Sequence, residues 1–424
     1  MKNRLILDKN EIISELGNDY KNISNIFSDK FGIVNAMLCR YELEKYGLHM
    51  YQCLSANTKE LFRISREVSS GGLGIHKEKK YAIIGCLAEA LERYSMSFIP
   101  EKDIKLSSLD KIENKRRFDD FYVYNEKQYL NNKIFSNPYK DSIYWTKIYS
   151  IKNKKDWKYW PASLIYLPFD LESPVAENTS TGMAAGLNIR DCIKSGLLEL
   201  IERDAIMINF MQKLNPPEIN IDEIGGFNKD LISKIKREYN IKIYKLYSDI
   251  NVPIYLSFVW NKKLGKIHFG IGASANLDSD YAINKALKEC LFTYFYSNNI
   301  MKDRKKDPNK INALYEHFLY YQGSNFNKLL FDSEVIKYKR ERIKYEELLY
   351  ELKKNNIDVY YKELTTPDIV DTGIKVVKVI APGLIDLNKS HLLPRLGANR
   401  FWEVPKKLHL EYTKELRKDP HPFP

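Results

Sequence analysis

The sequence predicts a mixed fold of the α/β (α+β) class. Short segments rich in Ile, Val and Tyr alternate along the whole chain with longer segments in which apolar residues recur at helical spacing. No linker rich in Pro, Gly or Ser divides the 424 residues, and no abrupt change of composition separates one part from another. We therefore expect one interlocked body rather than a string of separate domains.

The expected strands are short runs of β-branched and aromatic residues, and the expected helices are longer runs with an apolar stripe. The strands are predicted at 158–167, 242–247, 254–260, 266–274, 357–364 and 374–380. The helices are predicted at 78–97, 190–212, 281–296 and 338–354.

Charge and cysteine content exclude several classes of protein. The net charge of +12 favours anionic partners, but the basic residues are dispersed and accompany no nucleic-acid motif, so a nucleic-acid binder is not expected. The 5 cysteines form no CxxC pair and no zinc spacing, which indicates reduced thiols. The apolar run at the N-terminus is too short for a signal peptide, and no stretch is long enough to span a membrane. A cytoplasmic location is the expectation.

A weak internal repeat is the most informative feature of the chain. In each copy, a loop of small, polar and Gly residues precedes a helix that carries the pattern E-x-x-E-R. The first copy runs from Ser69 to Arg93 and the second from Ser180 to Arg203. The last loop glycine lies 15 residues before the first glutamate in one copy and 13 in the other. A third, degraded copy runs from Gly270 into Glu289.

The repeat places paired carboxylates on one face of each predicted helix, because residues three apart are neighbours there. These acids are Glu89, Glu92, Glu199 and Glu202. One such face alone is usually a solvated surface of ion pairs. If the two helices face each other, however, four ionised carboxylates require cations between them, and hard oxygen ligands select Mg²⁺ or Ca²⁺. Gly-rich backbone and Arg203 would then suit phosphate groups, although the chain has no GxxxxGK[ST] loop. The pattern predicts a nucleotide–metal site with two pseudo-equivalent halves.

These blocks, in this order, resemble the motifs of the YcaO family. Segment 69–95 is similar to its first ATP-binding motif, and segment 178–205 is similar to its second. Segment 270–294 resembles a third block, and 381–384 and 397–400 resemble the C-terminal region of azoline-forming members. The chain ends Pro420-His421-Pro422-Phe423-Pro424, a P-x-P-x-P ending typical of the cyclodehydratase branch. The resemblance covers the chain from about residue 65 to its end.

The resemblance implies the YcaO fold, with layered mixed and antiparallel sheets, flanking helices and an ATP site between pseudo-repeated halves. It implies that a Cys, Ser or Thr side chain of a ribosomal precursor peptide attacks the preceding peptide carbonyl. The carbonyl oxygen then takes the γ-phosphoryl group of ATP and leaves as phosphate, which yields a thiazoline or oxazoline. The implied Mg²⁺ ligands are Glu89, Glu92, Glu199 and Glu202. The implied nucleotide contacts are Ser70, Gly72, Ser180, Thr181, Gly182, Arg203 and Lys285. The implied catalytic element is the tail with Pro420, Pro422 and Pro424.

The tail and the phosphate site each carry an open question. Three prolines at a two-residue period stiffen the tail, so that its terminal carboxylate can be presented at little entropic cost; the alternative is a frayed chain end. The family's first loop has a Lys where Leu73 stands, and Thr181 replaces an Asn. Phe292 and Tyr294 stand where Arg and Gln often follow the third-block Glu. Lys285 could supply a cation instead, although a Lys on such a helix is usually solvated.

The expected domain limits are 1–64 for an N-terminal segment integrated with the core, 65–405 for the ATP-binding cyclodehydratase domain and 406–424 for the tail. The expected partners are the precursor peptide, an E1-like leader-binding protein and an FMN-dependent azoline dehydrogenase. Two alternatives remain open. A YcaO enzyme of another kind would use sulfide or an amine to make thioamides or amidines. A catalytically weak scaffold would instead dock a peptide for a partner enzyme.

Overall fold

The structure, a computed structural model, describes residues 4–62, 71–115, 123–131, 135–138, 140–262, 267–300, 307–323 and 325–424. The chain forms two compact units, each built from several segments. Unit 1 comprises Met1–Phe121, Glu126–Leu197 and Asp358–Pro382. Unit 2 comprises Tyr122–Asn125, Leu198–Ile357 and Gly383–Pro424. Helix α5 (Ile189–Met211) begins in unit 1 and ends in unit 2.

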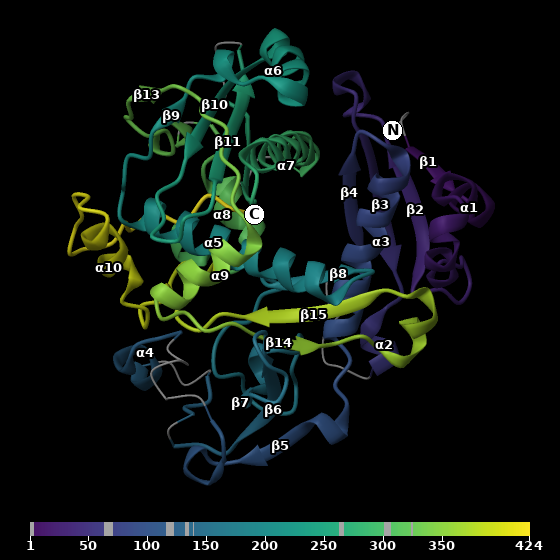
Figure 1. The fold of residues 1–424 in the computed structure, drawn as a ribbon, viewed down its shortest axis with the longest axis vertical. Coiled ribbons are helices and arrows are strands. Elements are labelled where there is room, and N and C mark those ends of the chain that lie inside the picture. The colour runs from purple at the N-terminus through teal and green to yellow at the C-terminus, as the bar shows by residue number, and fades with distance from the viewer. Residues whose placement is uncertain are drawn as a thin grey trace. The chain divides into compact units, whose positions relative to one another are not determined.

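One sheet of unit 1 is antiparallel and has the strand order β1-β2-β3-β4 (Figure 1). Its strands are β1 (Arg4–Leu7), β2 (Val34–Arg40), β3 (His49–Ser55) and β4 (Gly72–His76). Helix α1 (Lys9–Leu16) begins with a capping box, in which Asp8 and Glu11 each accept from the other's backbone N–H. Helix α2 (Thr58–Phe62) follows β3. Helix α3 (Lys79–Met96) packs against β3 and β4.

The other sheet of unit 1 has the order β5-β6-β14-β15-β8, with β7 paired to β6. Its strands are β5 (Ile104–Ser107), β6 (Ile143–Ser150), β7 (Trp157–Pro161), β8 (Met183–Gly186), β14 (Tyr360–Glu363) and β15 (Lys375–Ile380). The short helix α4 (Glu126–Asn131) precedes β6. Helix α3 also contacts β8 and β15. Both sheets of unit 1 therefore border the helix that carries Glu89 and Glu92.

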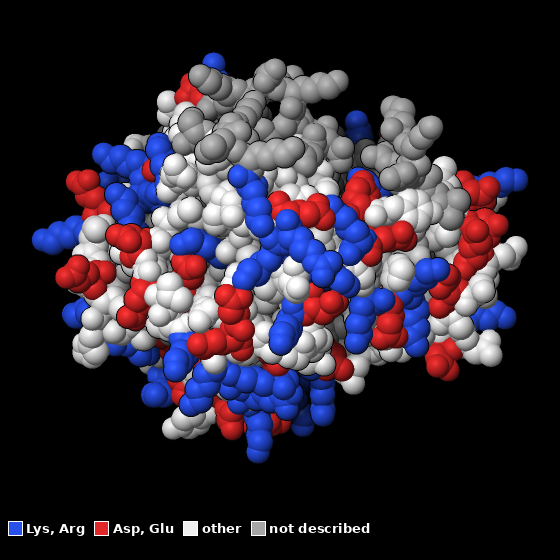
Figure 2. Space-filling model, turned by 90° about the horizontal axis from the view of Figure 1, so that it is seen from above, with Lys and Arg blue, Asp and Glu red and all other residues white. Residues whose placement is uncertain are grey.

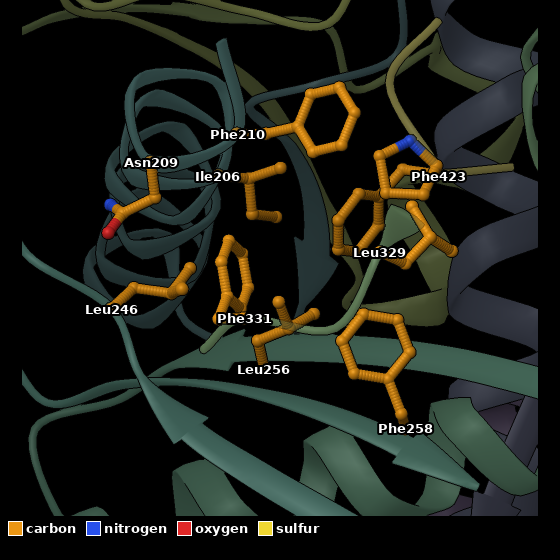
Figure 3. A pocket seen from close by; sticks show the side chains of 10 residues that line it. Ile206, Asn209, Phe210, Leu246, Leu256, Phe258, Leu329, Phe331 and Phe423 are labelled. Atoms are coloured by element: carbon orange, nitrogen blue, oxygen red, sulfur yellow. The ribbon is translucent and has the colours of Figure 1, made fainter. Parts of the chain in front are cut away.

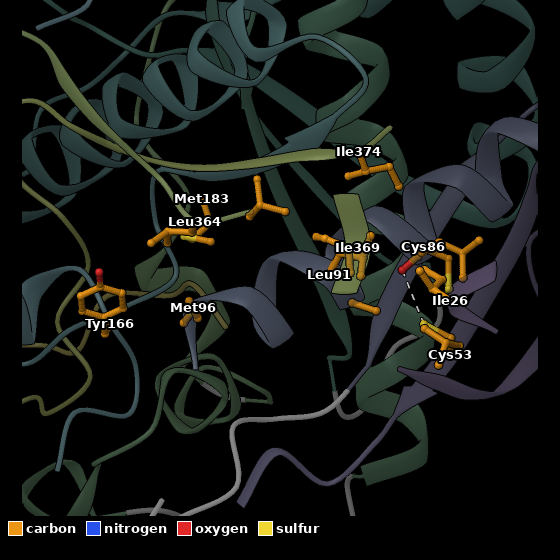
Figure 4. Close-up of a cluster of buried hydrophobic side chains, with 14 of the residues drawn as sticks. Ile26, Cys53, Cys86, Leu91, Met96, Tyr166, Met183, Leu364, Ile369 and Ile374 are labelled. Atoms are coloured by element: carbon orange, nitrogen blue, oxygen red, sulfur yellow. Dashed lines mark hydrogen bonds between the residues drawn. The ribbon is translucent and has the colours of Figure 1, made fainter. Parts of the chain in front are cut away.

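The hydrophobic core of unit 1 lies around α3. Cys53 of β3 and Cys86 of α3 lie side by side, and the Cys53 thiol donates to the Cys86 carbonyl at 3.5 Å (Figure 4). Leu91 on the same helix and Met183 on β8 are buried in the same cluster (Figure 4). Apolar neighbours cover much of the surface of α3, so only part of this surface is left for its polar side chains.

Unit 2 contains a sheet with the order β12-β11-β10-β9-β13. Its strands are β9 (Glu218–Ile219), β10 (Tyr239–Lys245), β11 (Ile254–Asn261), β12 (Phe269–Ala275) and β13 (Val335–Ile336). The pairs are antiparallel except for β13 with β9. Helix α7 (Ser279–Ile300) packs on β12 and β11, and α6 (Gly226–Glu238) packs on β10 and α7. Helices α8 (Leu314–Tyr320), α9 (Tyr345–Lys354) and α10 (Arg400–Lys407) complete this unit.

The expected elements are present; most of their limits differ by a few residues from the predicted ones, and two differ more. The helix expected from residue 338 begins only at Tyr345, because the preceding segment is held at the residue before α7: Arg340 and Arg342 both bind Asp278. The strand expected at 158–167 ends at Pro161, whose missing N–H ends the ladder, and a 3₁₀ turn Ala162–Leu164 follows. The predicted mixed α/β (α+β) class is confirmed.

Candidate nucleotide and metal site

The repeat found in the sequence corresponds to the strand–helix pairs β4–α3 and β8–α5, and the degraded copy to β12–α7. The first loop is expected at Ser69–Gly74. Its first two residues lie outside the described residues, and from Gly72 on the prediction is wrong, because Gly72–His76 form strand β4. Its glycines let strand and helix approach closely. A Cβ on Gly72 would lie 1.9 Å from the Cys86 carbonyl oxygen, and one on Gly74 would lie 1.7 Å from that of Ala82. Close packing, rather than a turn, thus explains this glycine pattern.

The degraded copy keeps the same packing in unit 2. A Cβ on Gly270 would lie 2.1 Å from the Cys290 carbonyl oxygen. In the first copy the N–H between the glycines, that of Leu73, donates to Glu89 at 2.8 Å. In the third copy the corresponding N–H, that of Ile271, donates to the Thr293 hydroxyl at 2.8 Å. Thr293 thus occupies in unit 2 the position that Glu89 occupies in unit 1. The third copy therefore has a hydroxyl where the first copy has a carboxylate.

Glu89 and Glu92 of unit 1 are both bound by backbone N–H groups. Besides Leu73, Glu89 binds Arg93 one turn along α3, and its side chain is 33% exposed. Glu92 accepts from the N–H of Ala185 on β8 at 2.8 Å. The two carboxylates thus join α3 to a strand of each sheet of unit 1, in addition to any role with a ligand.

The second loop, expected at Ser180–Gly186, is a loop only up to Gly182, because Met183–Gly186 form strand β8, and a buried lysine holds the part that is a loop. Ser180 is exposed at the loop, and Gly182 has φ +84°, which favours glycine. Lys378 of β15 is 6% exposed and donates to the carbonyls of Thr179 and Thr181 at 2.8 and 2.7 Å. Sequence reasoning missed Lys378, because a lysine within a strand carries no motif. Ser70 of the first copy lies outside the described residues.

The second carboxylate pair shares its part of unit 2 with Arg203. The guanidinium lies 3.8 Å from Glu199 and 3.7 Å from Glu202. Glu202 is only 2% exposed and accepts from the N–H of Ala275 at the end of β12, at 3.1 Å. The solvated-surface interpretation is therefore wrong for Glu202. Burial raises the pKa of its carboxyl to about 7, with Glu289 adding to the rise and Arg203 opposing it.

Glu289 and Lys285 of α7 belong to the same charged cluster. They face each other at 3.7 Å along the helix. The Lys285 side chain is 53% exposed, as expected for a solvated lysine, and against its partial desolvation Glu289, Glu202 and Glu199 raise the Lys285 pKa. Glu289 was not among the predicted ligands, although the degraded third copy pointed to it.

The unit 2 acids fit a divalent cation in their chemistry. Glu199, Glu202 and Glu289 are hard oxygen donors, and the charges of Glu199 and Glu289 oppose ionisation of the buried Glu202. Within the described ranges, however, no three His, Cys, Asp or Glu side chains are grouped so that they could hold a metal ion. The convergence of these acids with Glu89 and Glu92 stays a prediction, as do the ligand roles.

The C-terminal tail is buried over residues 420–423 rather than frayed, and Pro424 is exposed. The Phe423 ring is 4% exposed and sits among the side chains of Phe210, Leu256, Phe258 and Leu329 (Figure 3). The void left beside it measures about 10 Å³, close to the space of one water molecule. The Arg203 guanidinium lies over this ring, 5.9 Å from its centroid. The tail therefore reaches the E-x-x-E-R sequence of α5 within unit 2.

The segment before the tail is anchored by buried ions. Arg400 at the start of α10 binds Asp204 at 2.6 Å and Asp249 at 2.7 Å. Asp204 directly follows Arg203 and also accepts from the N–H of Ile385. On another side of unit 2, the segment Lys414–His421 borders a cleft of about 620 Å³ that Trp402 and His391 also line.

Acidic and basic side chains are interspersed over most of the face seen in Figure 2, and Lys and Arg gather at its lower centre. Exposed pairs such as Lys234 with Asp230 and Lys236 with Asp222 are consistent with solvated charge. Among the described helices, none combines the length and the apolar character needed to cross a membrane.

The sequence matches the family described as YcaO cyclodehydratase, ATP- and Mg²⁺-binding, over residues 73–385. An uncharacterised protein of Methanothermobacter thermautotrophicus is 24% identical over 240 residues, which cover 53% of this chain and 61% of that protein. A heterocyclase in complex with substrate and cofactor has a TM-score of 0.75 at 20% identity, covering 98% of this chain and 57% of its own. The chain thus spans about three fifths of the length of each of these two proteins.

Two further structures have the same fold. YcaO from Methanopyrus kandleri, bound with AMPPCP and Mg²⁺, has a TM-score of 0.60 at 16% identity and covers 83% of this chain and 86% of its own. A chain of the E. coli microcin synthetase McbBCD complex with pro-MccB17 bound has a TM-score of 0.66 at 16% identity, covering 92% and 96%. The family match extends over well more than half of the sequence, and its motifs lie on the repeated strand–helix pairs. The chain belongs to the YcaO family of ATP- and Mg²⁺-binding cyclodehydratases.

Proposed function

We propose that the chain cyclises Cys, Ser or Thr residues of a ribosomally made precursor peptide to thiazolines or oxazolines, at the expense of ATP. The observation that carries this proposal is the C-terminal tail: Phe423 is buried beneath Arg203 of the E-x-x-E-R helix. Chain ends usually fray because ordering them costs conformational entropy, so a tail held against the motif helix supports a role beyond ending the chain. Burial at the motif helix supports a role in the reaction for the terminal Pro424.

The reaction balances as the loss of one water for each ring. The side-chain oxygen or sulfur bonds to the preceding carbonyl carbon and loses its proton. The carbonyl oxygen takes a phosphoryl group, which makes a poor leaving group a good one, and leaves as phosphate while the amide nitrogen gives up its proton. ATP supplies that phosphoryl group, and Mg²⁺ neutralises charge at the phosphates.

In this proposal the chain's own residues bind Mg²⁺ and bind and orient the nucleotide. Glu89, Glu92, Glu199 and Glu202 hold Mg²⁺, and Glu289 joins them because its charge acts on the buried Glu202. The nucleotide contacts are Ser70, Gly72, Ser180, Thr181, Gly182, Arg203 and Lys285. Lys378 shapes the loop at Ser180 from behind, by holding the carbonyls on either side of it.

A catalytically weak scaffold is the second candidate. One support is Leu73, which stands where the family has a Lys. The other is that backbone N–H groups and Arg side chains already bind the carboxylates of Glu89 and Glu202, which are the proposed metal ligands. YcaO enzymes that make thioamides or amidines would share the ATP site, and the P-x-P-x-P tail favours azolines over both.

We propose a leader-binding E1-like protein and an FMN-dependent azoline dehydrogenase as partners; McbBCD is likewise a multi-protein complex with a peptide bound.

The test is incubation of the chain with ATP, Mg²⁺, an E1-like partner and precursor peptide, followed by mass spectrometry. Loss of one water per ring together with release of ADP and phosphate is the expected result. A chain lacking Pro420–Pro424 should bind peptide but form no rings. Ring formation by that truncated chain would remove the role of the tail, and thioamide or amidine products would assign the alternative chemistry.

A further inference from the structure

The tail is held by a stack of two histidine rings. His317 of α8 and His421 of the tail lie with ring centroids 4.0 Å apart and planes 11° apart. Both are buried, at 0% and 2% exposure. The proposed reaction gives His317 no role, and a buried histidine in a parallel stack is an unusual way to fill a core.

Two adjacent backbone carbonyls, one for each ring, determine which ring nitrogen carries the hydrogen. Nε2 of His317 lies 2.8 Å from the Lys389 oxygen, and Nε2 of His421 lies 2.9 Å from the Asn388 oxygen. A carbonyl only accepts, so each Nε2 carries the hydrogen and Nδ1 of a neutral ring becomes an acceptor. The Phe423 N–H donates to that Nδ1 of His421 at 3.3 Å. The tautomer of His421 thus supports the bend that leads into Phe423.

The two stacked histidine rings are uncharged. Burial lowers the pKa of His317 to about 4; His391 adds to this, while the Lys389 carbonyl and Glu316 oppose it. Burial also lowers the pKa of His421 well below its usual range, helped by His317, Arg203 and His391 against the Asn388 carbonyl. Both rings are therefore neutral at neutral pH, and shape and dispersion rather than charge hold them together.

The bend at His421 delivers the chain end to Arg203. Phe423 follows the bend directly and lies under the guanidinium, while the last residue, Pro424, is exposed. Arg203 in turn pairs with Glu199 and Glu202. A contiguous set of contacts therefore leads from α8, through two histidines and a phenylalanine, to the E-x-x-E-R helix.

We propose that His317 is a positioning residue for the terminal Pro424 carboxylate in ring formation. It acts through His421, whose ring it holds in the plane in which Nε2 meets the Asn388 carbonyl, and not by touching the peptide or the nucleotide. The proposal rests on the proposed function, in which the tail takes part in the reaction.

The test compares full-length His317→Ala and His317→Phe with wild type and with His268→Ala. His268 is a matched control in the same unit, because its Nε2 also lies 2.9 Å from a carbonyl, that of Tyr294, and its ring packs on an aromatic ring at 4.6 Å. One readout is the ¹⁵N NMR spectrum of histidine-labelled protein, which reports the tautomer of His421 without substrate. The other is kcat for ring formation and KM for ATP.

In His317→Ala the His421 signal should change to that of averaged tautomers, and kcat should fall roughly tenfold to a hundredfold, because displacement by about 1 Å costs that much. KM for ATP should stay within about twofold. His317→Phe keeps the stack and should recover most of kcat, and His268→Ala should change neither readout. His421→Ala should reproduce the loss, and the double variant should be no worse than either single one.

Two results would overturn the proposal while the wild-type chain still forms rings: an unchanged His421 signal in both His317 variants, or a changed signal with unchanged kcat. If His317→Ala fails to fold, His317→Leu takes its place in both readouts, since it fills the space without a planar ring that can stack on His421. A wild-type chain that forms no ring with partner and precursor overturns the proposed function, and the positioning role with it. Failure of the one is thus distinguishable from failure of the other.

Discussion

The Glu202 carboxylate accepts a hydrogen bond from the backbone N–H of Ala275, at the end of the strand of the next repeat copy. Glu92, the equivalent residue of the first copy, accepts from Ala185 on the strand of the second copy. The second glutamate of E-x-x-E-R thus ties each motif helix to the following strand. One oxygen of each carboxylate is used in this way, so these acids have a structural task besides the proposed binding of Mg²⁺.

Replacement of Glu202 by Gln separates the two tasks. Gln keeps an oxygen that can accept from Ala275, so the melting temperature should not fall, and removal of a buried charge favours the folded state. Ring formation should drop by at least about a hundredfold, because the ligand charge is lost. The exposed Glu346→Gln on α9 is the control. Turnover in Glu202→Gln equal to that of Glu346→Gln would exclude a metal-binding role.

The tight strand–helix packing makes a sharp prediction at two glycines of the first copy. Gly72→Ala would place a Cβ 1.9 Å from the Cys86 carbonyl, so β4 and α3 must separate, and we expect little folded protein. Gly85→Ala lies on the same helix with its Cβ 3.7 Å from the nearest atom. It should stabilise the protein by about 0.5–1 kcal/mol, because Ala favours helix over Gly. Thermal unfolding of both variants is the measurement, and equal melting temperatures would contradict this packing.

Arg400 offers a test of the buried ions behind the motif helix. Arg400→Met leaves Asp204, at 1% side-chain exposure, buried without its cation and Asp249, at 5%, with Lys407 alone, and should destabilise unit 2 by about 3–5 kcal/mol. Arg340 bridges two aspartates in the same manner, Asp278 and Asp280, but its side chain is 44% exposed. Arg340→Met should therefore change urea unfolding little. Similar losses in both variants would mean that burial does not set the energetics of these networks.

The repeat and its acids could be predicted from the sequence, but the packing of its glycines and the burial of Glu202 could not. Period and spacing identified the helices with Glu89 and Glu199, because helical periodicity is a local signal. The glycines before α3 could not be assigned correctly, since Gly in a turn and Gly under a packed helix look alike in one sequence. The burial of Glu202 depends on β12, which lies far along the chain, and a helical wheel cannot show it.

The tail and its supports illustrate the same limit. The P-x-P-x-P ending could be read directly, and its ordering followed from proline stiffness. His317 and Lys378, which hold the tail and the loop, stand in segments without any motif. Their roles arise from tertiary contacts with Asn388–Lys389 carbonyls and with the Thr179–Thr181 loop, so only the structure could identify them.

The buried carboxyl of Glu172 predicts how stability depends on pH. Burial raises its pKa to about 7, although it accepts from the Tyr144 N–H at 2.9 Å. Because the folded state holds this proton more tightly than the unfolded state does, stability should fall as pH rises from about 4.5 to about 7. Glu172→Gln should be more stable than wild type at pH 8 and no more stable at pH 4. The exposed Glu113→Gln is the control, and parallel urea midpoints for all three proteins across this range would contradict the assignment.

Phe423 anchors the tail and allows catalysis to be separated from stability. Phe423→Ala removes the ring from its apolar pocket, a change that costs about 3–5 kcal/mol in a core. At a chain end the tail can detach instead of leaving a cavity, so the melting temperature should fall by only a few degrees. Ring formation should fall far more, because Pro424 is no longer held in place by a neighbouring ring that packs against Arg203. Phe423→Leu keeps an apolar anchor and should recover part of the activity. A large loss of thermal stability with full ring formation would show that the ring serves the fold of unit 2 and not the position of the tail.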